Sequence, residues 1–218
     1  MSAFSFTKAT KRQARLRMAL IGPSGSGKTY SALAIASAMA PSGKIAVIDT
    51  ERGSASKYAG IFAFDVLELD TFAPETYASA IEAAGAAGYD VLIIDSLSHA
   101  WFGKDGALEQ VDRAAKRSSS QNSFAAWREV TPHHNAMIDA ILQCPCHVIV
   151  TMRAKTEYVM ETNEKGKSVP RKVGLSPVQR DGLEYEFDVV ADMNLDNDLI
   201  VSKSRCPAMS GQVVNKPG

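Results

Sequence analysis

The chain has 218 residues, of which 45% are hydrophobic and 22% are charged, so it can bury the core of a globular domain. Its 24 basic residues balance 24 acidic ones, and net charge therefore indicates neither a nucleic acid nor a membrane as a partner. No apolar run approaches the roughly 20 residues of a membrane helix, and the basic N-terminus lacks the features of a secretory signal. Three cysteines in no disulfide or metal pattern favour a reducing compartment. We expect one cytoplasmic domain, covering residues 1–218.

Apolar, β-branched runs alternate with helix-like stretches along the first 150 residues. Strands are expected at Arg15–Ile21, Lys44–Ile48, Val66–Leu69, Tyr89–Ile94 and His147–Thr151. Helices are expected at Lys28–Met39, Pro74–Ala87 and Phe124–Leu142, the last with an interruption at Pro132. This alternation is typical of an α/β fold with a mostly parallel sheet flanked by helices.

Three further segments are predicted to lie outside this core. Residues 1–14 form a basic N-terminal arm, and residues 153–180 form a basic loop or hairpin. Phe187–Leu195 and Leu199–Ser204 predict a C-terminal β-hairpin that turns through Asp196–Asp198. The sequence then ends without an obvious closing helix, so we expect that a C-terminal segment is missing.

The segment GPSGSGKT fits the P-loop pattern GxxxxGK[ST] and lies between a predicted strand and a predicted helix. Its glycines let backbone N–H groups and the helix N-terminus face a phosphate, Lys28 reaches the β and γ oxygens, and Thr29 ligates Mg²⁺. We therefore expect ATP and Mg²⁺ as cofactors. The expected nucleotide-binding residues are Gly22, Pro23, Ser24, Gly25, Ser26, Gly27, Lys28 and Thr29.

Two acidic residues at strand ends complete the predicted site. Asp95 ends an apolar strand and is the expected second ligand of the metal. AAA+ motors carry a glutamate directly after that aspartate, but this chain has Ser96 there, so the general base must come from elsewhere. Glu51 is the predicted base, because neighbouring parallel strands bring their carboxyl ends to one edge of the sheet. Asp49 is the competing candidate.

The P-loop, the strand-end glutamate and Asp95-Ser96 together resemble the core of RecA-like recombinases. The segments IDSLSHAW (residues 94–101) and DGLEYEFD (residues 181–188) are similar to phage-encoded ATPases of the Sak type. Those compact RecA-like proteins are associated with single-strand annealing and are often catalogued as AAA-family ATP-binding proteins. The resemblance implies a DNA-stimulated ATPase, encoded by a phage or prophage in a bacterial host. Its implied partners are single-stranded DNA, further copies in a filament or ring with ATP between subunits, and a single-strand-binding protein.

The resemblance also implies roles for two residues near the nucleotide. Tyr58 is placed like the RecA tyrosine that stacks on adenine, although an aromatic residue of the core is an equal alternative. Arg153 falls where RecA has a glutamine that senses the γ-phosphate. A guanidinium at this position can contact the same phosphate and take part in catalysis, and a solvated arginine is the alternative.

Two more resemblances concern contacts between subunits. Lys203 and Arg205 resemble the paired lysines with which a RecA subunit reaches the nucleotide of its neighbour, where they would stabilise transition-state charge. An exposed basic strand end is the alternative. Phe6 and Ala9 fit the F-x-x-A tether by which related recombinases dock onto the adjacent subunit.

Positive charge is concentrated in residues 153–180, which contain seven basic and three acidic residues. Connections of this length are usually functional or disordered, and this one follows the strand after which RecA places its second DNA loop. The residues expected to contact DNA phosphates here are Lys155, Lys165, Lys167, Arg171 and Lys172. A first DNA loop is expected at Arg113–Asn122, through Arg113, Lys116 and Arg117.

Other functions fit the same motifs. The basic stretch could instead be a solvated lid over the nucleotide. The whole chain could then be a small P-loop kinase or phosphotransferase, or a nucleotide-dependent binding module with weak turnover.

Overall fold

A computed structural model describes residue 8 and residues 14–117, 122–162 and 168–217. Its strands are β1 (Arg17–Gly22), β2 (Ile45–Asp49), β3 (Asp65–Glu68), β4 (Val91–Asp95), β5 (His147–Thr162), β6 (Ser168–Pro177), β7 (Val189–Met193), β8 (Asp198–Ser204) and β9 (Val213–Asn215). Its α-helices are α1 (Lys28–Met39), α2 (Pro74–Ala86), α3 (His99–Phe102), α4 (Ala107–Arg117) and α5 (Ser123–Gln143). Short 3₁₀ turns are η1 (Ala55–Tyr58), η2 (Leu183–Glu186) and η3 (Pro207–Met209).

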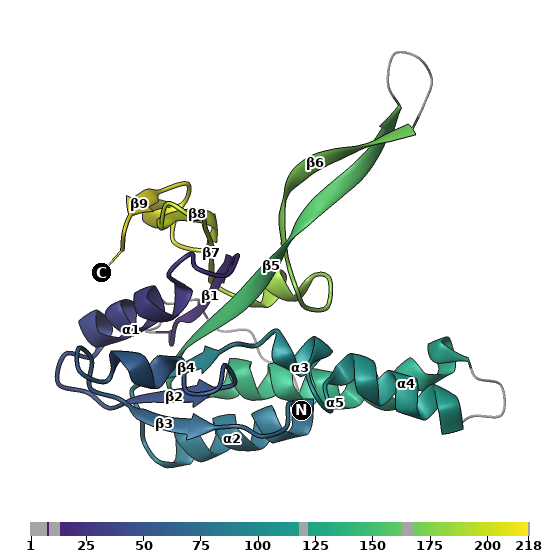
Figure 1. The fold of residues 1–218 in the computed structure, drawn as a ribbon. Coiled ribbons are helices and arrows are strands. Elements are labelled where there is room, and N and C mark those ends of the chain that lie inside the picture. Colours follow the sequence, from purple (N-terminus) through teal and green to yellow (C-terminus); the bar gives the residue numbers. More distant parts are fainter. Residues whose placement is uncertain (1–7, 9–13, 118–121, 163–167, 218) are drawn as a thin grey trace.

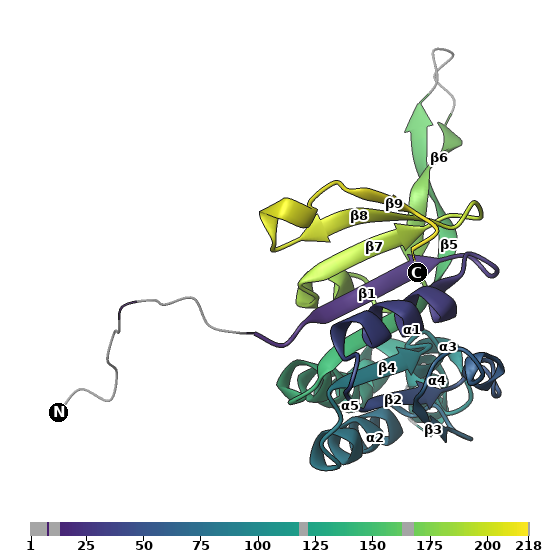
Figure 2. The same cartoon turned by 90° about the vertical axis from the view of Figure 1, so that its left-hand side faces the viewer.

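The strands form one sheet in the order β3-β2-β4-β5-β1-β7-β8-β9, and β6 pairs with β5 off this path. Strands β1 to β5 and β7 run parallel to one another, whereas β6 pairs with β5, β8 with β7 and β9 with β8 in antiparallel fashion (Figures 1 and 2). The predicted α/β class with a mostly parallel, helix-flanked sheet is thus confirmed. Because these strands are parallel, the segments that follow β1, β2 and β4 meet Arg153 of β5 at one edge of the sheet.

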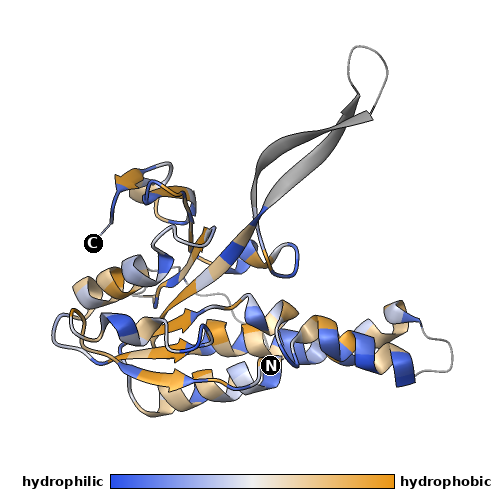
Figure 3. Cartoon of the chain, in the orientation of Figure 1, coloured by the Kyte–Doolittle hydropathy of each residue, from blue (hydrophilic) through white to orange (hydrophobic). Residues whose placement is uncertain are grey.

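Helices cover both faces of the sheet, which explains why its strands are almost uniformly apolar. Side chains alternate along β1, so that Ala19 and Ile21 pack with α2 and α5 while Met18 and Leu20 pack with α1. Figure 3 shows these apolar strands at the centre of the body and hydrophilic residues along α4. The two buried layers hold the carboxyl edge of the sheet, and hence the site, in place.

The predicted core elements agree closely with the structure. Helix α1 begins and ends at the predicted residues, and α2 ends one residue earlier than predicted. Helix α5 continues through Pro132 instead of being interrupted there. The predicted C-terminal hairpin forms as β7 and β8, and the short strand β9 adds to it.

Helices α4 and α5 pack together and extend beyond the sheet (Figure 1). Helix α4 buries Ala107, Val111 and Ala114 against Ala126 and Val130 of α5. The expected loop at residues 113–122 is therefore wrong for residues 113–117, which complete α4. The reason is the spacing of Ala107, Val111 and Ala114, which places these three buried residues on one helical face. Residues 118–121 lie outside the described residues.

Strand β5 belongs to the core at its start and to a long hairpin at its end. Residues up to Arg153 pair with β1 in parallel, and Arg153 itself lies opposite Gly22, the first residue of the P-loop. From Ala154 onward the strand pairs with β6 in an antiparallel hairpin that projects from the body (Figures 1 and 2). Arg153 therefore marks the junction between the nucleotide edge and the hairpin.

Candidate nucleotide-binding site

The P-loop curls tightly between β1 and α1. Gly25 and Gly27 both have φ of +84°, a conformation that side-chain-bearing residues rarely adopt. A Cβ atom on Gly22 would lie 2.6 Å from the backbone oxygen of Met193. Among the described residues, no side chain caps α1 and no acidic residue lies in its first turn. The first N–H groups of this helix can therefore face an anion.

Lys28 is folded back onto this loop. Its Nζ donates to the backbone oxygens of Gly22 at 2.9 Å and of Pro23 at 2.7 Å. Burial lowers the pKa of Lys28, while the carboxylates of Asp95 and Glu51 oppose that effect. The loop, the two carboxylates and Arg153 of β5 line a pocket of about 360 Å³. Its lining residues are Ser24, Gly25, Gly27, Lys28, Thr29, Glu51, Ser54, Tyr58, Asp95 and Arg153.

Asp95 is buried at the end of β4 and accepts two hydroxyl hydrogen bonds. Thr29 Oγ1 donates to its Oδ2 at 2.7 Å, and Thr151 Oγ1 donates to its Oδ1. Burial raises the pKa of Asp95, and the two hydroxyl donors lower it. The peptide bond between Asp95 and Ser96 is cis.

The oxygens of Thr29 and Asp95 fit a magnesium ion, which is a hard cation. A bound magnesium ion would neutralise phosphate charge. The described residues contain no group of three His, Cys, Asp or Glu side chains that could hold a metal by themselves. Mg²⁺ in nucleotide sites takes most of its ligands from phosphates and water, so the protein need supply only the oxygens of Thr29 and Asp95.

The two candidate bases after β2 have different environments. Asp49 is 1% exposed, and its Oδ1 and Oδ2 accept backbone N–H groups from Glu51 at 2.6 Å and Ala55 at 3.0 Å. Both of its oxygens thus hold the turn after β2. Glu51 instead turns its carboxylate into the pocket. Of the two, only Glu51 lines the pocket, so it remains the predicted base.

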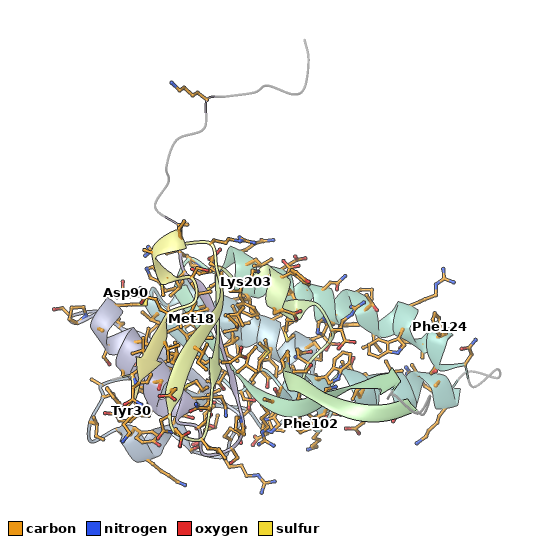
Figure 4. The ribbon with its side chains drawn as sticks, turned by 90° about the horizontal axis from the view of Figure 1, so that it is seen from above. Met18, Tyr30, Asp90, Phe102, Phe124 and Lys203 are labelled. Carbon is orange, nitrogen blue, oxygen red and sulfur yellow. The ribbon has the colours of Figure 1, made fainter. Side chains whose placement is uncertain are left out.

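The Glu51 carboxylate is held by Arg153 through three hydrogen bonds. Nη2 donates to Oε2 at 2.6 Å and to Oε1 at 2.9 Å, and Nε donates to Oε1 at 3.1 Å. The backbone N–H of Arg153 donates to Ser98 Oγ at 2.9 Å. Its guanidinium carbon lies 5.5 Å from the centre of the Phe102 ring, a residue labelled in Figure 4. Arg153 therefore joins the predicted base to the hairpin.

Tyr58 lines the same pocket at the end of η1. Its ring meets that of Tyr30 edge-on, with centroids 5.7 Å apart, and it packs against the buried layer on the α1 side. Tyr58 therefore both lines the pocket and packs on the core, and its stacking on adenine stays a prediction.

Lys203 and Arg205 lie at the other end of the sheet, because β8 runs antiparallel to β7. Lys203 Nζ donates to the backbone oxygens of Glu184, Tyr185 and Phe187, and Lys203 is labelled in Figure 4. Arg205 pairs with Asp188 at 3.0 Å. These two residues do not line the pocket of their own chain.

Sequence reasoning missed several contacts of the site. Asn197, in the turn between β7 and β8, has its Nδ2 3.4 Å from the backbone oxygen of Gly25. The sequence predicted this turn but contained no signal that it would pack on the P-loop. Thr151, Ser98 and His99 also support the site. Ser98 and His99 follow the end of β4, and Thr151 is the last residue of the strand predicted at His147–Thr151. A position at a strand end is the signal by which they could have been found.

The residues expected to bind DNA fall into two groups. Lys155 is exposed on β5, and Arg171 and Lys172 lie on β6 opposite residues 159 and 158. On α4, Arg113 pairs with Asp105 at 2.7 Å and Arg117 with Glu129 at 2.6 Å, while Lys116 is exposed. Two of the three basic residues of α4 are therefore in ion pairs. Lys165, Lys167, Phe6 and Ala9 lie outside the described residues.

A family model described as an AAA domain matches residues 14–213. The chain belongs to this AAA-domain family. It is therefore an AAA-type P-loop ATPase domain that binds nucleotide, and its site carries Ser96 where AAA+ motors have a glutamate. A comparison with curated proteins finds no match. Within the described ranges, the helices are all too short or too polar to cross a membrane.

Proposed function

We propose that this ATPase is a RecA-like recombinase that binds single-stranded DNA, depends on ATP and promotes annealing or strand exchange for a phage or prophage. The observation that carries the proposal is the path of β5. This strand leaves the nucleotide pocket at Arg153 and continues without a break into the basic hairpin. Binding at the hairpin could therefore change the position of the group that holds Glu51.

The composition of the hairpin suits a nucleic acid. Residues 153–180 carry seven basic and three acidic residues in a chain without net charge. Basic side chains on a projecting ribbon can follow a phosphate backbone, and they supply affinity that depends on salt and not on sequence. A lid over the nucleotide would need to fold back onto the P-loop, whereas this hairpin points away from the body (Figure 1).

The positions of Lys203 and Arg205 support assembly. Both lie at the sheet end opposite the P-loop, so a second copy stacked head to tail could present them to the nucleotide of its neighbour. Cations in that position would stabilise charge that develops during phosphoryl transfer. The same arrangement would put ATP between subunits, in a ring or a filament, with Phe6 and Ala9 as the tether.

The test measures ATP hydrolysis and oligonucleotide binding together. We expect single-stranded DNA to stimulate hydrolysis by the wild-type protein. Replacing Lys165, Lys167, Arg171 and Lys172 by Ser should weaken DNA binding, with about 0.7 lost from the log–log salt slope for each phosphate contact. ATP affinity without DNA should stay the same. A matched control replaces Lys44, Lys104, Arg128 and Lys216 by Ser, four exposed residues outside the hairpin.

Three outcomes would contradict the proposal. Equal DNA affinity and salt slope in the wild type and the hairpin variant would reject the hairpin as the DNA site and direct attention to Arg113, Lys116 and Arg117. Loss of ATP affinity in the hairpin variant, with no DNA binding by the wild type, would favour a lid and a metabolite kinase. ATP hydrolysis that never responds to DNA would leave a nucleotide-dependent module.

A further inference from the structure

His99 lies next to the predicted base at the carboxyl edge of the sheet. Its Nδ1 is 2.7 Å from Thr50 Oγ1, and its Nε2 is 3.9 Å from Glu51 Oε1. The imidazole stacks on Phe72, with ring centroids 5.0 Å apart. It also meets Phe102 edge-on, and the residue is only 9% exposed. The ring is therefore fixed in place by packing on two sides and by one short hydrogen bond.

The hydrogen-bond network indicates which ring nitrogen carries the proton. The backbone oxygen of Ser96 already accepts from the hydroxyl of Tyr77 at 3.0 Å, and the N–H of Ser96 donates to Thr50 Oγ1 at 2.8 Å. The hydroxyl of Thr50 has two acceptors within reach, Ser96 O at 3.1 Å and His99 Nδ1 at 2.7 Å. We assign its proton to the nearer His99 Nδ1, because an Nδ1–H tautomer would leave the lone pair of Nε2 directed at the Glu51 carboxylate. With Nδ1 as the acceptor, the proton of the neutral ring is on Nε2 and faces the carboxylate of Glu51.

We infer that His99 is a positioning residue for Glu51, and that its Nε2–H keeps this carboxylate directed at the attacking water when Arg153 turns toward the γ-phosphate. The inference rests on the proposed role of Glu51 as general base. It deepens that proposal by naming the second group that holds the carboxylate.

The position of Arg153 explains why a second hydrogen-bond donor to the Glu51 carboxylate is needed. Its guanidinium forms all of its described side-chain hydrogen bonds with Glu51, and its side chain is 43% exposed in an open pocket. An arginine that moves to a phosphate must release some of these bonds. Glu51 would then be free to rotate, unless another donor on the far side holds it. The distance of 3.9 Å is too long for a hydrogen bond, and a small shift of Glu51 away from Arg153 would close it.

The surroundings of His99 favour a neutral donor. The charged groups that face the imidazole are Glu51, Arg153 and Asp49. Burial is the largest influence and lowers the pKa of His99, Glu51 and Asp49 oppose that effect, and Arg153 adds to it. A neutral imidazole holds the carboxylate without strongly lowering its basicity, which suits a group that must accept a proton.

Two substitutions separate positioning from packing. His99→Gln keeps an amide N–H near the place of Nε2, whereas His99→Asn keeps only an amide near the place of Nδ1. Both remove the imidazole stacked on Phe72, so both should lose similar thermal stability. We expect His99→Asn to lower kcat by about 10-fold or more, with KM for ATP and the Kd of a non-hydrolysable analogue within about twofold of wild type. His99→Gln should keep kcat within about threefold of wild type.

A double substitution tests whether the effect acts through Glu51. In a Glu51→Gln background, His99→Asn should cause no further loss of kcat, because the carboxylate that it positions is gone. An equal loss in both backgrounds would overturn the inference, as would a wild-type kcat in His99→Asn or equal losses in the Asn and Gln variants.

An NMR measurement gives a readout that does not depend on activity. The chain has 4 histidines, so ¹⁵N-labelled imidazoles can be assigned by single substitutions. We expect the ring of His99 to be neutral with its proton on Nε2 at pH 7.5. A proton on Nδ1 would overturn the inference even if the protein hydrolyses ATP. Full activity in Glu51→Gln would instead overturn the proposed base.

Discussion

The guanidinium of Arg153 lies against the carboxylate of Glu51, with Nη2 2.6 Å from Oε2. The two residues are 102 positions apart, and they meet because β4 alone separates β2 from β5 in the sheet. One of them is the predicted base, and the other begins the segment that leads into the hairpin. A bound phosphate would compete with Glu51 for the same guanidinium, so the pair can respond to the nucleotide.

Replacement of Arg153 by Ala should uncouple the two sites. Without the guanidinium, the hairpin loses its link to Glu51, so DNA should no longer stimulate hydrolysis, while each ligand alone binds within about threefold of wild-type affinity. Stimulated and basal ATPase rates, with separate titrations of ATP analogue and oligonucleotide, check this. The matched control is Lys155→Ala, two residues further along β5. It should weaken DNA binding, but bound DNA should still stimulate ATP hydrolysis. Normal stimulation in Arg153→Ala would contradict the prediction.

Glu51→Gln should leave nucleotide binding intact and lower turnover by at least about 100-fold, because the amide cannot accept a proton from water. It keeps an oxygen that can still accept from Arg153, so the fold should be unaffected. Single-turnover hydrolysis and analogue binding give the two quantities. A variant that hydrolyses ATP at the wild-type rate would show that the base lies elsewhere.

Asp49→Asn should act on stability instead of catalysis. Asp49 accepts the backbone N–H groups of Glu51 and Ala55, and an amide can accept with only one of its two terminal atoms. Loss of one charge-assisted hydrogen bond in a buried turn should cost about 2 kcal/mol of unfolding free energy. Urea unfolding measures this loss. If turnover fell as far as in Glu51→Gln while stability stayed the same, Asp49 would be the base.

Lys28→Ala should weaken nucleotide binding by about 10–100-fold, because it removes a charge-assisted contact to phosphate. The nucleotide-free protein should keep its stability, since Lys28 now donates only to two loop carbonyls that water can reach after the change. Calorimetric titration with an ATP analogue provides the affinity, and Lys44→Ala is the control. Unchanged affinity would argue against a phosphate site in this loop.

Stability should fall as the pH decreases from about 7.5 to 5.5. Burial lowers the pKa of His99, His134 and His147 in the folded protein. The unfolded chain therefore binds more protons than the folded one below the ordinary histidine pKa of about 6.5, and acidification favours unfolding. Urea midpoints across this range measure the slope, and His99→Asn should reduce it. A flat or rising midpoint on acidification would contradict the prediction.

Local signals in the sequence were sufficient for the core of the fold. Helix α1 could be predicted to the residue, because the P-loop lysine starts it and an Ala-rich run continues it. Helix α4 was missed because Ala107–Arg117 is rich in charged residues and its repeating apolar pattern covers only a short stretch of sequence. For residues 153–180 the sequence left a loop and a hairpin open, because Lys, Arg and Glu interrupt the apolar residues beyond Thr151. A hairpin strand that projects into solvent needs no buried, apolar residues.

The candidate site could be predicted only in part for a different reason. The motif and the strand-end acids indicate which residues lie together at the carboxyl edge of the sheet. They do not indicate which hydrogen-bond partner each of these residues has. Asp49 and Glu51 lie at and just after the end of β2. The backbone of the following turn directs two N–H groups to the carboxylate oxygens of Asp49 and none of these to Glu51. The contacts of Glu51 with Arg153 and His99 depend on the sheet order and on long side chains, which no local pattern encodes.

Strand β5 has 16 residues, so it spans about 50 Å from the centre of the sheet to the distal end of the ribbon. Its pairing with β6 shifts register once, between Glu157 and Tyr158. Successive residues of a strand face opposite sides, so one inserted residue would turn every following side chain to the other side of the ribbon. Insertion of two residues in each arm would preserve both the facing and the pairing. Ribbon length can therefore vary between homologues, or be engineered, in steps of two residues per arm without disturbing the ATPase centre.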